Sequence, residues 1–193
     1  MSTVDDGTGD GLSAKVSQNK NLHVFAVIET EHEAAIDIGQ GFNLNTGTIS
    51  LTAATESICA YMKNTQDNVY VIDAIAVGQG NAATQTEMST IKIYRNPTSV
   101  DFSTAGDQNG NMNFGSNLEF TGLWYKGTEG STQTGGTAIA QFFSAEGTRL
   151  YATIPMEIPT GSSIAIGIDP NISSGTMPVY VALIGHFKDP KES

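Results

Sequence analysis

The group of side chains that most suggests chemistry lies around one histidine. His32 sits between carboxylates in the segment ETEHE, residues 29–33. A metal site needs ligands on converging elements, each oriented by further hydrogen bonds. Here the donors follow one another along a short connection, where successive side chains diverge. We therefore favour a charged turn at a sheet edge and expect no metal.

A second acidic segment, near the N-terminus, partly matches a calcium-binding loop. Asp6, Thr8, Asp10 and Gly11 have the spacing of the first ligands of such a loop. The position that should supply the closing acidic ligand is Ser17. Because that ligand is missing, we favour a solvated, flexible arm over a calcium site.

We expect the reactive side chains that stand alone in the sequence to have structural rather than chemical roles. Cys59 is the only cysteine, which excludes an intrachain disulfide. It lies mid-strand with no activating neighbour, so we expect a small buried hydrophobic residue. Asp73 lies in an apolar strand and needs a partner if buried; Arg95 on a neighbouring strand is the expected one, in a structural ion pair. His23 and His186 are each alone in apolar strands and are expected to be structural.

No combination of residues predicts catalysis. Glu29, Asp73 and Glu157 are scattered acids rather than a pair that converges in a cleft. The GQGN segment at residues 78–81 has neither the lysine nor the following helix of a phosphate-binding loop. We expect the protein to have no enzymatic activity and to bind no cofactor.

One aromatic pair could bind a ligand or a partner. Trp124, the only tryptophan, is followed by Tyr125 and the polar segment 127–137. The pair could form a sugar-stacking platform or an interface anchor, or it could belong to the core. We favour burial, because Phe120, Leu123 and Tyr125 do not share one face of a strand. The segment 127–137 is expected to be a flexible, exposed loop.

The elements that must position these residues are β-strands, and two of them dominate the middle of the chain. Residues 56–63 alternate, with Ile58 and Met62 on one face. Residues 69–77 are apolar at nearly every position, so both faces should be covered. The polar residues 64–68 between them have the composition of a hairpin turn. We predict that these two strands form the central antiparallel pair.

Further strands are expected at 22–30, 34–38, 42–51, 88–95, 100–104, 118–126, 137–143, 148–154, 163–169 and 178–187. Asn96-Pro97 should end the strand at 88–95, and Asn109-Gly110 should form a tight turn in a long loop over 105–116. The pattern predicts an all-β chain: a single β-sandwich, jelly-roll-like, of roughly ten short antiparallel strands. Residues 1–20 are expected to be a flexible N-terminal arm, 21–188 the β-sandwich domain, and 189–193 an exposed tail.

The charge and hydrophobic composition limit the kinds of partner that the protein can bind. The 193 residues carry 20 acidic against 9 basic side chains, a net charge of −11. That field repels nucleic acid and anionic membrane surfaces. No stretch approaches the roughly 20 apolar residues of a membrane span, and the first residues have no signal-peptide pattern. We expect synthesis in the cytoplasm and no binding to nucleic acid or membrane.

Several phrases of the sequence resemble small virion structural proteins of tailed bacteriophages. They are FNLNTGTISLTAATESICAYMKN (42–64), VYVIDAIAV (69–77) and IYRNPT (93–98), with IPMEIPTGSSIAIGIDP (154–170) similar to the closing strands of jelly-roll modules in such particles. The resemblance implies a capsid decoration (cement) protein: a β-sandwich, usually trimeric, seated on the outer capsid surface. It implies an N-terminal arm that helps attachment, and it brings no catalytic residues.

The resulting expectation is a non-enzymatic virion protein that binds the major capsid protein, as a homotrimer, and stabilises the shell. The binding candidates in the arm are Leu12, Lys15 and Val16. The alternative is a receptor-binding, adhesion or carbohydrate-binding module that uses Trp124 and Tyr125.

Overall fold

The computed structural model describes residues 3–5, 13–15, 30–52, 55–81 and 84–188. The chain divides into two units, Met1–Thr30 and Glu31–Ser193. In the first unit, β1 (Thr3–Asp5) pairs antiparallel with β2 (Ser13–Lys15). The strand predicted at 22–30, His23 and the tail 189–193 lie outside the described residues, and the boundary predicted after residue 20 stays a prediction.

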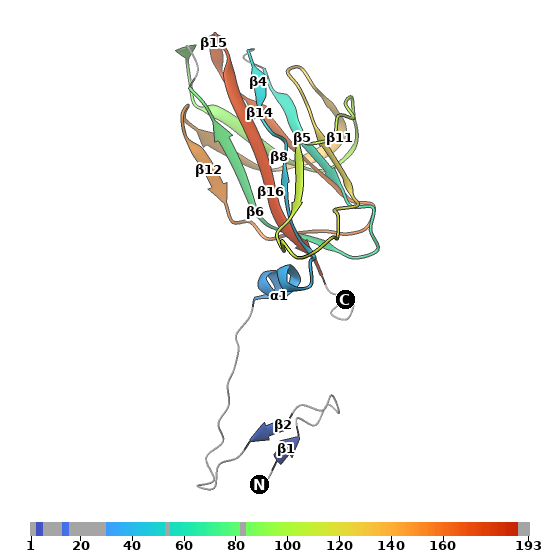
Figure 1. Ribbon diagram of the computed structural model, residues 1–193. Coiled ribbons are helices and arrows are strands. Elements are labelled where there is room, and N and C mark those ends of the chain that lie inside the picture. Colours follow the sequence, from blue (N-terminus) through green and yellow to red (C-terminus); the bar gives the residue numbers. More distant parts are fainter. Residues whose placement is uncertain (1–2, 6–12, 16–29, 53–54, 82–83, 189–193) are drawn as a thin grey trace. The chain divides into compact units, whose positions relative to one another are not determined.

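The second unit is a sandwich of two antiparallel sheets (Figure 1). The five-stranded sheet has the order β10 (Leu123–Lys126), β5 (Ser57–Lys63), β14 (Ser163–Asp169), β8 (Ser89–Val100), β11 (Gln133–Ser144). The seven-stranded sheet has the order β12 (Arg149–Ala152), β6 (Tyr70–Gln79), β16 (Met177–Phe187), β3 (Gly41–Asn45), β9 (Gln108–Asn111); β13 (Met156–Ile158) also pairs with β6, and β4 (Ile49–Leu51) with β16. A small ladder joins β15 (Ile172–Ser174) to β7 (Thr84–Gln85).

The order of the strands is that of a jelly roll. If β3 and β4 count as one interrupted strand, and β12 and β13 as another, eight main strands follow along the chain. One sheet holds the first, eighth, third and sixth, and the other holds the second, seventh, fourth and fifth. Every connection between successive main strands therefore crosses between the sheets, except the one from the fourth to the fifth (β8 to β11), as in the double Greek key of a jelly roll; the short strands β7, β9, β10 and β15 are left out of this count. The predicted all-β, jelly-roll-like sandwich is confirmed.

The core lies between the two sheets. Alternate residues of the central strands point into it, as the period of two in a strand requires. The five-stranded sheet contributes Ile164, Ile166 and Ile168 from β14, and the seven-stranded sheet contributes Val181 and Leu183 from β16. All five are at most 1% exposed. Ala165 is buried too, under the tyrosines of the outer face, so β14 does not have the single buried face that its alternation indicates.

The predicted central hairpin is wrong, because β5 and β6 belong to different sheets. Each is buried on both faces and is an inner strand of its own sheet: β5 lies between β10 and β14, and β6 lies between β16 and β12. The connection between them is fixed as a crossover by Asn64, which is fully buried. Its Nδ2 donates to the carbonyls of Asn68 and Ile158, each at 2.8 Å.

The strand predicted at 34–38 is also wrong, because this segment lies in the helix α1 (Glu31–Asp37). Thr30 and Glu33 have the Thr-x-x-Glu spacing of a capping box. At the other end Gly39 adopts φ +78°, and the amides of Gly39 and Gln40 donate to the carbonyls of Ile36 and Ala35. These are the two bonds of a Schellman motif, which ends the helix. Local capping therefore outweighs the apparent alternation of AAIDI.

Three smaller expectations fail for reasons of strand position. β8 continues through Pro97, because beyond Arg95 it pairs only with β11 and no ladder bond from the proline is needed. Asn109 and Gly110 lie in β9, paired with β3, rather than in a tight turn. In β5 the register skips Cys59, a β-bulge that turns Ile58 to the opposite face from Met62.

Candidate functional site

The two aromatic residues predicted to bind a partner lie on opposite faces of β10. Trp124 is 5% exposed, packs in the main core, and donates from Nε1 to the carbonyl of Asn45 at 3.2 Å. Tyr125 stacks on Tyr61 on the outer face of the five-stranded sheet, with ring centroids 6.1 Å apart. The structure therefore confirms the prediction that Trp124 is buried. The two rings do not form one platform.

The other predicted binding residues are placed only in part. Lys15 ends β2, opposite Thr3, while Leu12 and Val16 lie outside the described residues. The segment expected as a flexible loop at 127–137 is partly strand, since β11 begins at Gln133. Its first half is a bonded turn: Ser131 is buried, and its Oγ accepts from the amide of Thr128 at 2.9 Å.

Cys59 is buried, as expected, and burial raises the pKa of its thiol to about 12. The nearby charge of Glu56 acts in the same direction. Because the thiolate is the reactive form, this cysteine has no nucleophilic character at neutral pH.

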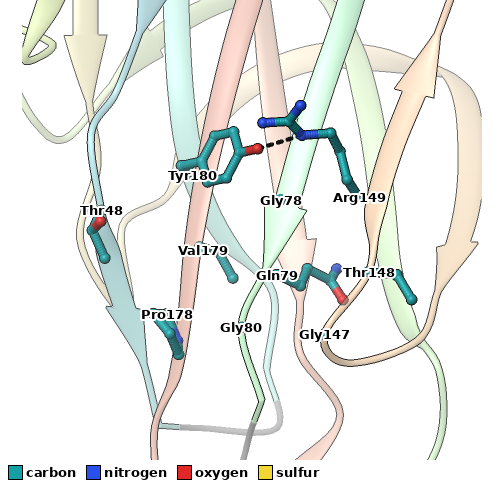
Figure 2. Close-up of a pocket in the computed structure, with 10 residues that line it drawn as sticks. All are labelled: Thr48, Gly78, Gln79, Gly80, Gly147, Thr148, Arg149, Pro178, Val179 and Tyr180. Atoms are coloured by element: carbon teal, nitrogen blue, oxygen red, sulfur yellow. Dashed lines mark hydrogen bonds between the residues drawn. The ribbon is translucent and has the colours of Figure 1, made fainter.

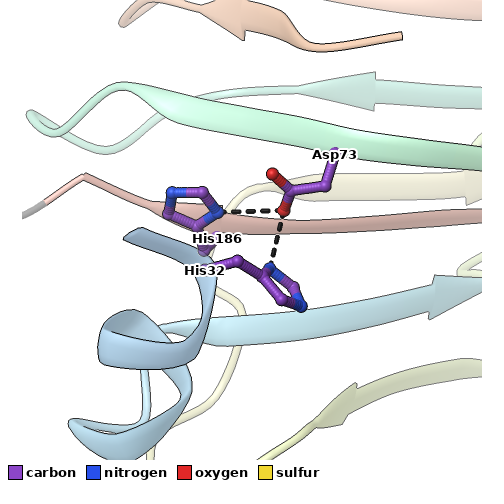
Figure 3. A group of neighbouring side chains, drawn as sticks. All are labelled: His32, Asp73 and His186. Atoms are coloured by element: carbon purple, nitrogen blue, oxygen red, sulfur yellow. Dashed lines mark hydrogen bonds and ion pairs between the residues drawn. The ribbon is translucent and has the colours of Figure 1, made fainter. Parts of the chain in front are cut away.

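The structure brings together three polar side chains that the sequence treats separately (Figure 3). His186 Nδ1 lies 2.9 Å from Asp73 Oδ2, within a hydrogen bond, and His32 Nδ1 lies 2.7 Å from the same oxygen. The two imidazole centroids are 5.6 Å apart, at 68°. His186 is 2% exposed, whereas the side chains of His32 and Asp73 are each 29% exposed. We call these three residues the His-Asp-His cluster.

Local structure explains how the cluster forms. The pairing of β6 with β16 skips Asp73, so this residue is the extra one of a β-bulge. A bulge re-aims a side chain, and here Asp73 shares the outer side of the sheet with His186. Gly185 fits beside the bulge only because it has no side chain: a Cβ there would lie 2.2 Å from the carbonyl oxygen of Val71. Helix α1 brings His32 to the same place.

The predicted pairing of Asp73 with Arg95 is therefore wrong, since the two lie in different sheets. His186, the one histidine of its apolar strand, contacts Asp73 and His32 from other elements, and His32 is part of a helix rather than a charged turn. The only signal in the sequence was Asp73 itself, a carboxylate inside an apolar strand. Which groups would meet it depended on the strand order.

A pocket of 390 Å³ lies where β6, β12 and β16 meet the connections near Gly80 and Gly147 (Figure 2). On one side Arg149 Nε donates to the hydroxyl of Tyr180 at 2.6 Å, and its guanidinium lies 5.6 Å from the centre of the ring. Gly78 leaves room for this ring, because a Cβ there would lie 1.9 Å from Tyr180 Cε1. Gln79 is 6% exposed, and neither atom of its amide has a partner among the described residues.

Strand β11 is an exposed edge of the five-stranded sheet. It pairs with β8 on one side only, and Ile139 and Phe143 are 49% and 61% exposed. Register shifts beside Gly135 and at Ile139 interrupt its ladder with β8. Exposed apolar side chains on an unpaired edge mark a surface suited to contact with another chain.

No helix in the described part of the chain combines the length and the apolar character that crossing a membrane requires.

Comparisons with known proteins identify no family for the chain. No protein-family model and no curated protein sequence matches the chain. Among solved structures, one similar chain is described as the structure of the Gx strain of infectious bursal disease virus, with 12% identity, a TM-score of 0.22 and 77% of this chain covered. Another is the D431N mutant VP2 protein of the same virus, from T=1 particles, with 10% identity, a TM-score of 0.13 and 80% covered.

The chain spans 35% and 41% of the lengths of those two viral chains. With such low TM-scores, the assignment of the fold rests on the strand order and the proposal of a function on the chain's own surface and sequence.

Proposed function

We propose that the protein is a non-enzymatic virion structural protein, and more narrowly a decoration (cement) protein that binds the outer surface of a phage capsid. Support comes from the jelly roll, a fold that viral capsid domains use, and from the sequence resemblance over 42–64 and 154–170. Lectin domains and cupins use the same fold, so the argument for a function has to come from the surface.

The observation that carries the proposal is the exposed edge strand β11. An assembly protein needs a surface that recognises another copy or the shell, and β11 offers Ile139 and Phe143 over twelve residues of unpaired edge. Its irregularities twist the backbone, a device that discourages continuous strand addition. Contact through side chains is therefore favoured over extension of the sheet.

In this proposal three copies associate through β11, and the trimer binds several subunits of the major capsid protein. Weak individual contacts then add through multivalency, which stabilises the shell against the pressure of packaged DNA. The arm, with Leu12, Lys15 and Val16, adds a further attachment. The net charge of −11 suits a basic or polar partner surface and opposes contact with nucleic acid.

The first test is the mass of the protein in solution, by multi-angle light scattering. We expect a trimer for the natural protein and a monomer for the double variant Ile139→Asp/Phe143→Asp. The matched control is Met88→Asp, which changes a residue that is 59% exposed before β8 and should leave the trimer intact. A natural protein that is monomeric at all concentrations, or a double variant that stays trimeric, would contradict assembly through β11.

Binding to the shell needs its own test, with expanded capsids of the phage that encodes the chain. Co-sedimentation should show saturable binding of the natural protein and reduced occupancy without residues 1–20. Full occupancy by the shortened protein would remove the arm from the proposal. Absence of any binding by the natural protein would overturn the decoration function itself.

A second candidate is a carbohydrate-binding or adhesion module, and the 390 Å³ pocket is the observation that favours it. Its volume is within the range of small-ligand sites, and Tyr180, Arg149 and Gln79 offer stacking and hydrogen bonds. A glycan array would test it: binding lost in Tyr180→Ala and retained in the double variant of β11 would favour this function.

A further inference from the structure

The His-Asp-His cluster has a feature that its protein atoms alone do not explain. Two ring nitrogens face one carboxylate oxygen, at 2.7 and 2.9 Å. His186 Nδ1 is in position for a hydrogen bond, whereas the buried Nδ1 of His32 contacts the same oxygen as an ion-pair partner without an aligned hydrogen bond among the described residues. An ion pair without an aligned hydrogen bond loses part of its stabilisation, and a cation held between the two nitrogens and the carboxylate would restore it.

We propose that the cluster binds one divalent transition-metal ion, with Zn²⁺ as the best match. The ligands are Nδ1 of His32, Nδ1 of His186 and Oδ2 of Asp73. The ion takes the place of the ring protons that face the carboxylate, and each imidazole then carries its proton on Nε2. The proposal is independent of any role in a virion.

The distances fit this exchange. With Zn–N and Zn–O bonds of about 2.0–2.1 Å in tetrahedral geometry, neighbouring ligand atoms lie about 3.3 Å apart. The observed 2.7 and 2.9 Å must therefore open by about half an ångström, an adjustment within reach of small side-chain rotations. The three donors together lie within 4.8 Å of one another.

The donor set selects the class of ion. Ca²⁺ and Mg²⁺ prefer shells of oxygen ligands, which two imidazoles cannot supply. Two histidines and one carboxylate suit Zn²⁺ and related ions and leave a position for water or a further ligand. Solvent can reach that position, because the side chains of His32 and Asp73 are each 29% exposed.

The surroundings also favour a cation. Glu31, the residue before His32 on α1, lines a 130 Å³ pocket together with His186. His186 Nε2 is buried and has no partner in the described part of the chain, so the proton it would carry when Nδ1 binds the ion is not committed to another protein group there. The whole chain carries a net charge of −11, which draws cations toward it.

Binding of the ion should stabilise the folded protein. The three ligands come from α1, β6 and β16, which are far apart in the sequence, so a bound ion ties the helix to the outer face of the seven-stranded sheet. An ion that binds only the folded state stabilises it. At a free concentration of Zn²⁺ 100 times the dissociation constant, we expect the Tm to rise by about 5–10 °C.

The test uses the full chain without a histidine tag, stripped with a chelator and dialysed. Titration calorimetry with Zn²⁺ should give one site per chain, and Ca²⁺ and Mg²⁺ should give none. In His32→Gln, on the partly exposed helix, the affinity for Zn²⁺ should fall by more than the 10–100-fold that is typical when a ligand loses only its hydrogen-bond partner. His23→Gln, which removes the remaining histidine, is the control and should bind as the natural protein does.

A second readout separates coordination from general stability. Co²⁺ bound at this site should give the visible absorption of a low-symmetry, histidine-ligated ion, and His32→Gln should abolish it while the circular dichroism of the fold persists. Equal Zn²⁺ affinity in the natural protein and His32→Gln, or no binding by the natural protein, would overturn the proposal.

Discussion

The crossover between β5 and β6 depends on one side chain, and its removal should be costly. Asn64 is fully buried and makes three side-chain hydrogen bonds: Nδ2 donates to the carbonyls of Asn68 and Ile158 at 2.8 Å, and Oδ1 accepts from the amide of Gln66 at 2.9 Å. At about 1 kcal/mol for each bond, Asn64→Ala should reduce the free energy of unfolding by about 3 kcal/mol.

Part of this cost arises because the substitution leaves the carbonyl of Ile158, in the buried end of β13, without its side-chain donor. For a chain of this length about 3 kcal/mol corresponds to a fall in Tm of roughly 6–12 °C. The assay is urea unfolding followed by the fluorescence of Trp124, whose burial makes its emission sensitive to unfolding.

The matched control is Thr65→Ala, the adjacent exposed residue, whose hydroxyl makes a single bond of 3.2 Å to the carbonyl of Thr121. We expect a change within about 0.5 kcal/mol for this control. A loss below about 1 kcal/mol in Asn64→Ala, with an unchanged dependence on urea, would refute the argument that this side chain fixes the crossover.

Three further predictions concern single groups. Because burial raises the pKa of Cys59 to about 12, a disulfide reagent at pH 8 should leave the native thiol unmodified and react with it in guanidinium; native reactivity would contradict this. Bonds from the amide and hydroxyl of Thr132 lower the pKa of Asp101 below 3.8, so it stabilises the fold above that pH and loses this effect as the pH falls through the lowered value. Asp101→Asn should therefore be less stable than the natural protein at pH 7, with the two converging in acid; a difference that persists at low pH would have another cause. Trp124 should show blue-shifted emission and weak quenching by acrylamide, and saccharides should not alter either, since the ring is buried in the core.

Much of the fold follows from local patterns that the sequence displays. Val179, Val181 and Leu183 alternate with other residues because a strand turns successive side chains to opposite faces, and the structure places all three in the core. The same local patterns predict the strands at 163–169 and 178–187, which the structure has at 163–169 and 177–187, and they predict the burial of Cys59. In α1 two local signals compete: the alternation of AAIDI favours a strand, and the capping residues favour a helix. The helix forms, so the capping residues outweigh the alternation.

Strand pairing is not local, and here only the tertiary structure decided. The polar segment 64–68 is compatible with a hairpin or with a crossover, and the contacts of Asn64 with residues near 158 select the crossover. The His-Asp-His cluster follows from that choice, because Asp73 meets His186 only when β6 lies beside β16. A bulge in that pairing then turns the carboxylate toward α1. The sequence by itself determined an all-β sandwich with a carboxylate in an apolar strand; the neighbours of that carboxylate, His32 and His186, are 41 and 113 residues away from it along the chain and meet it only in the tertiary structure.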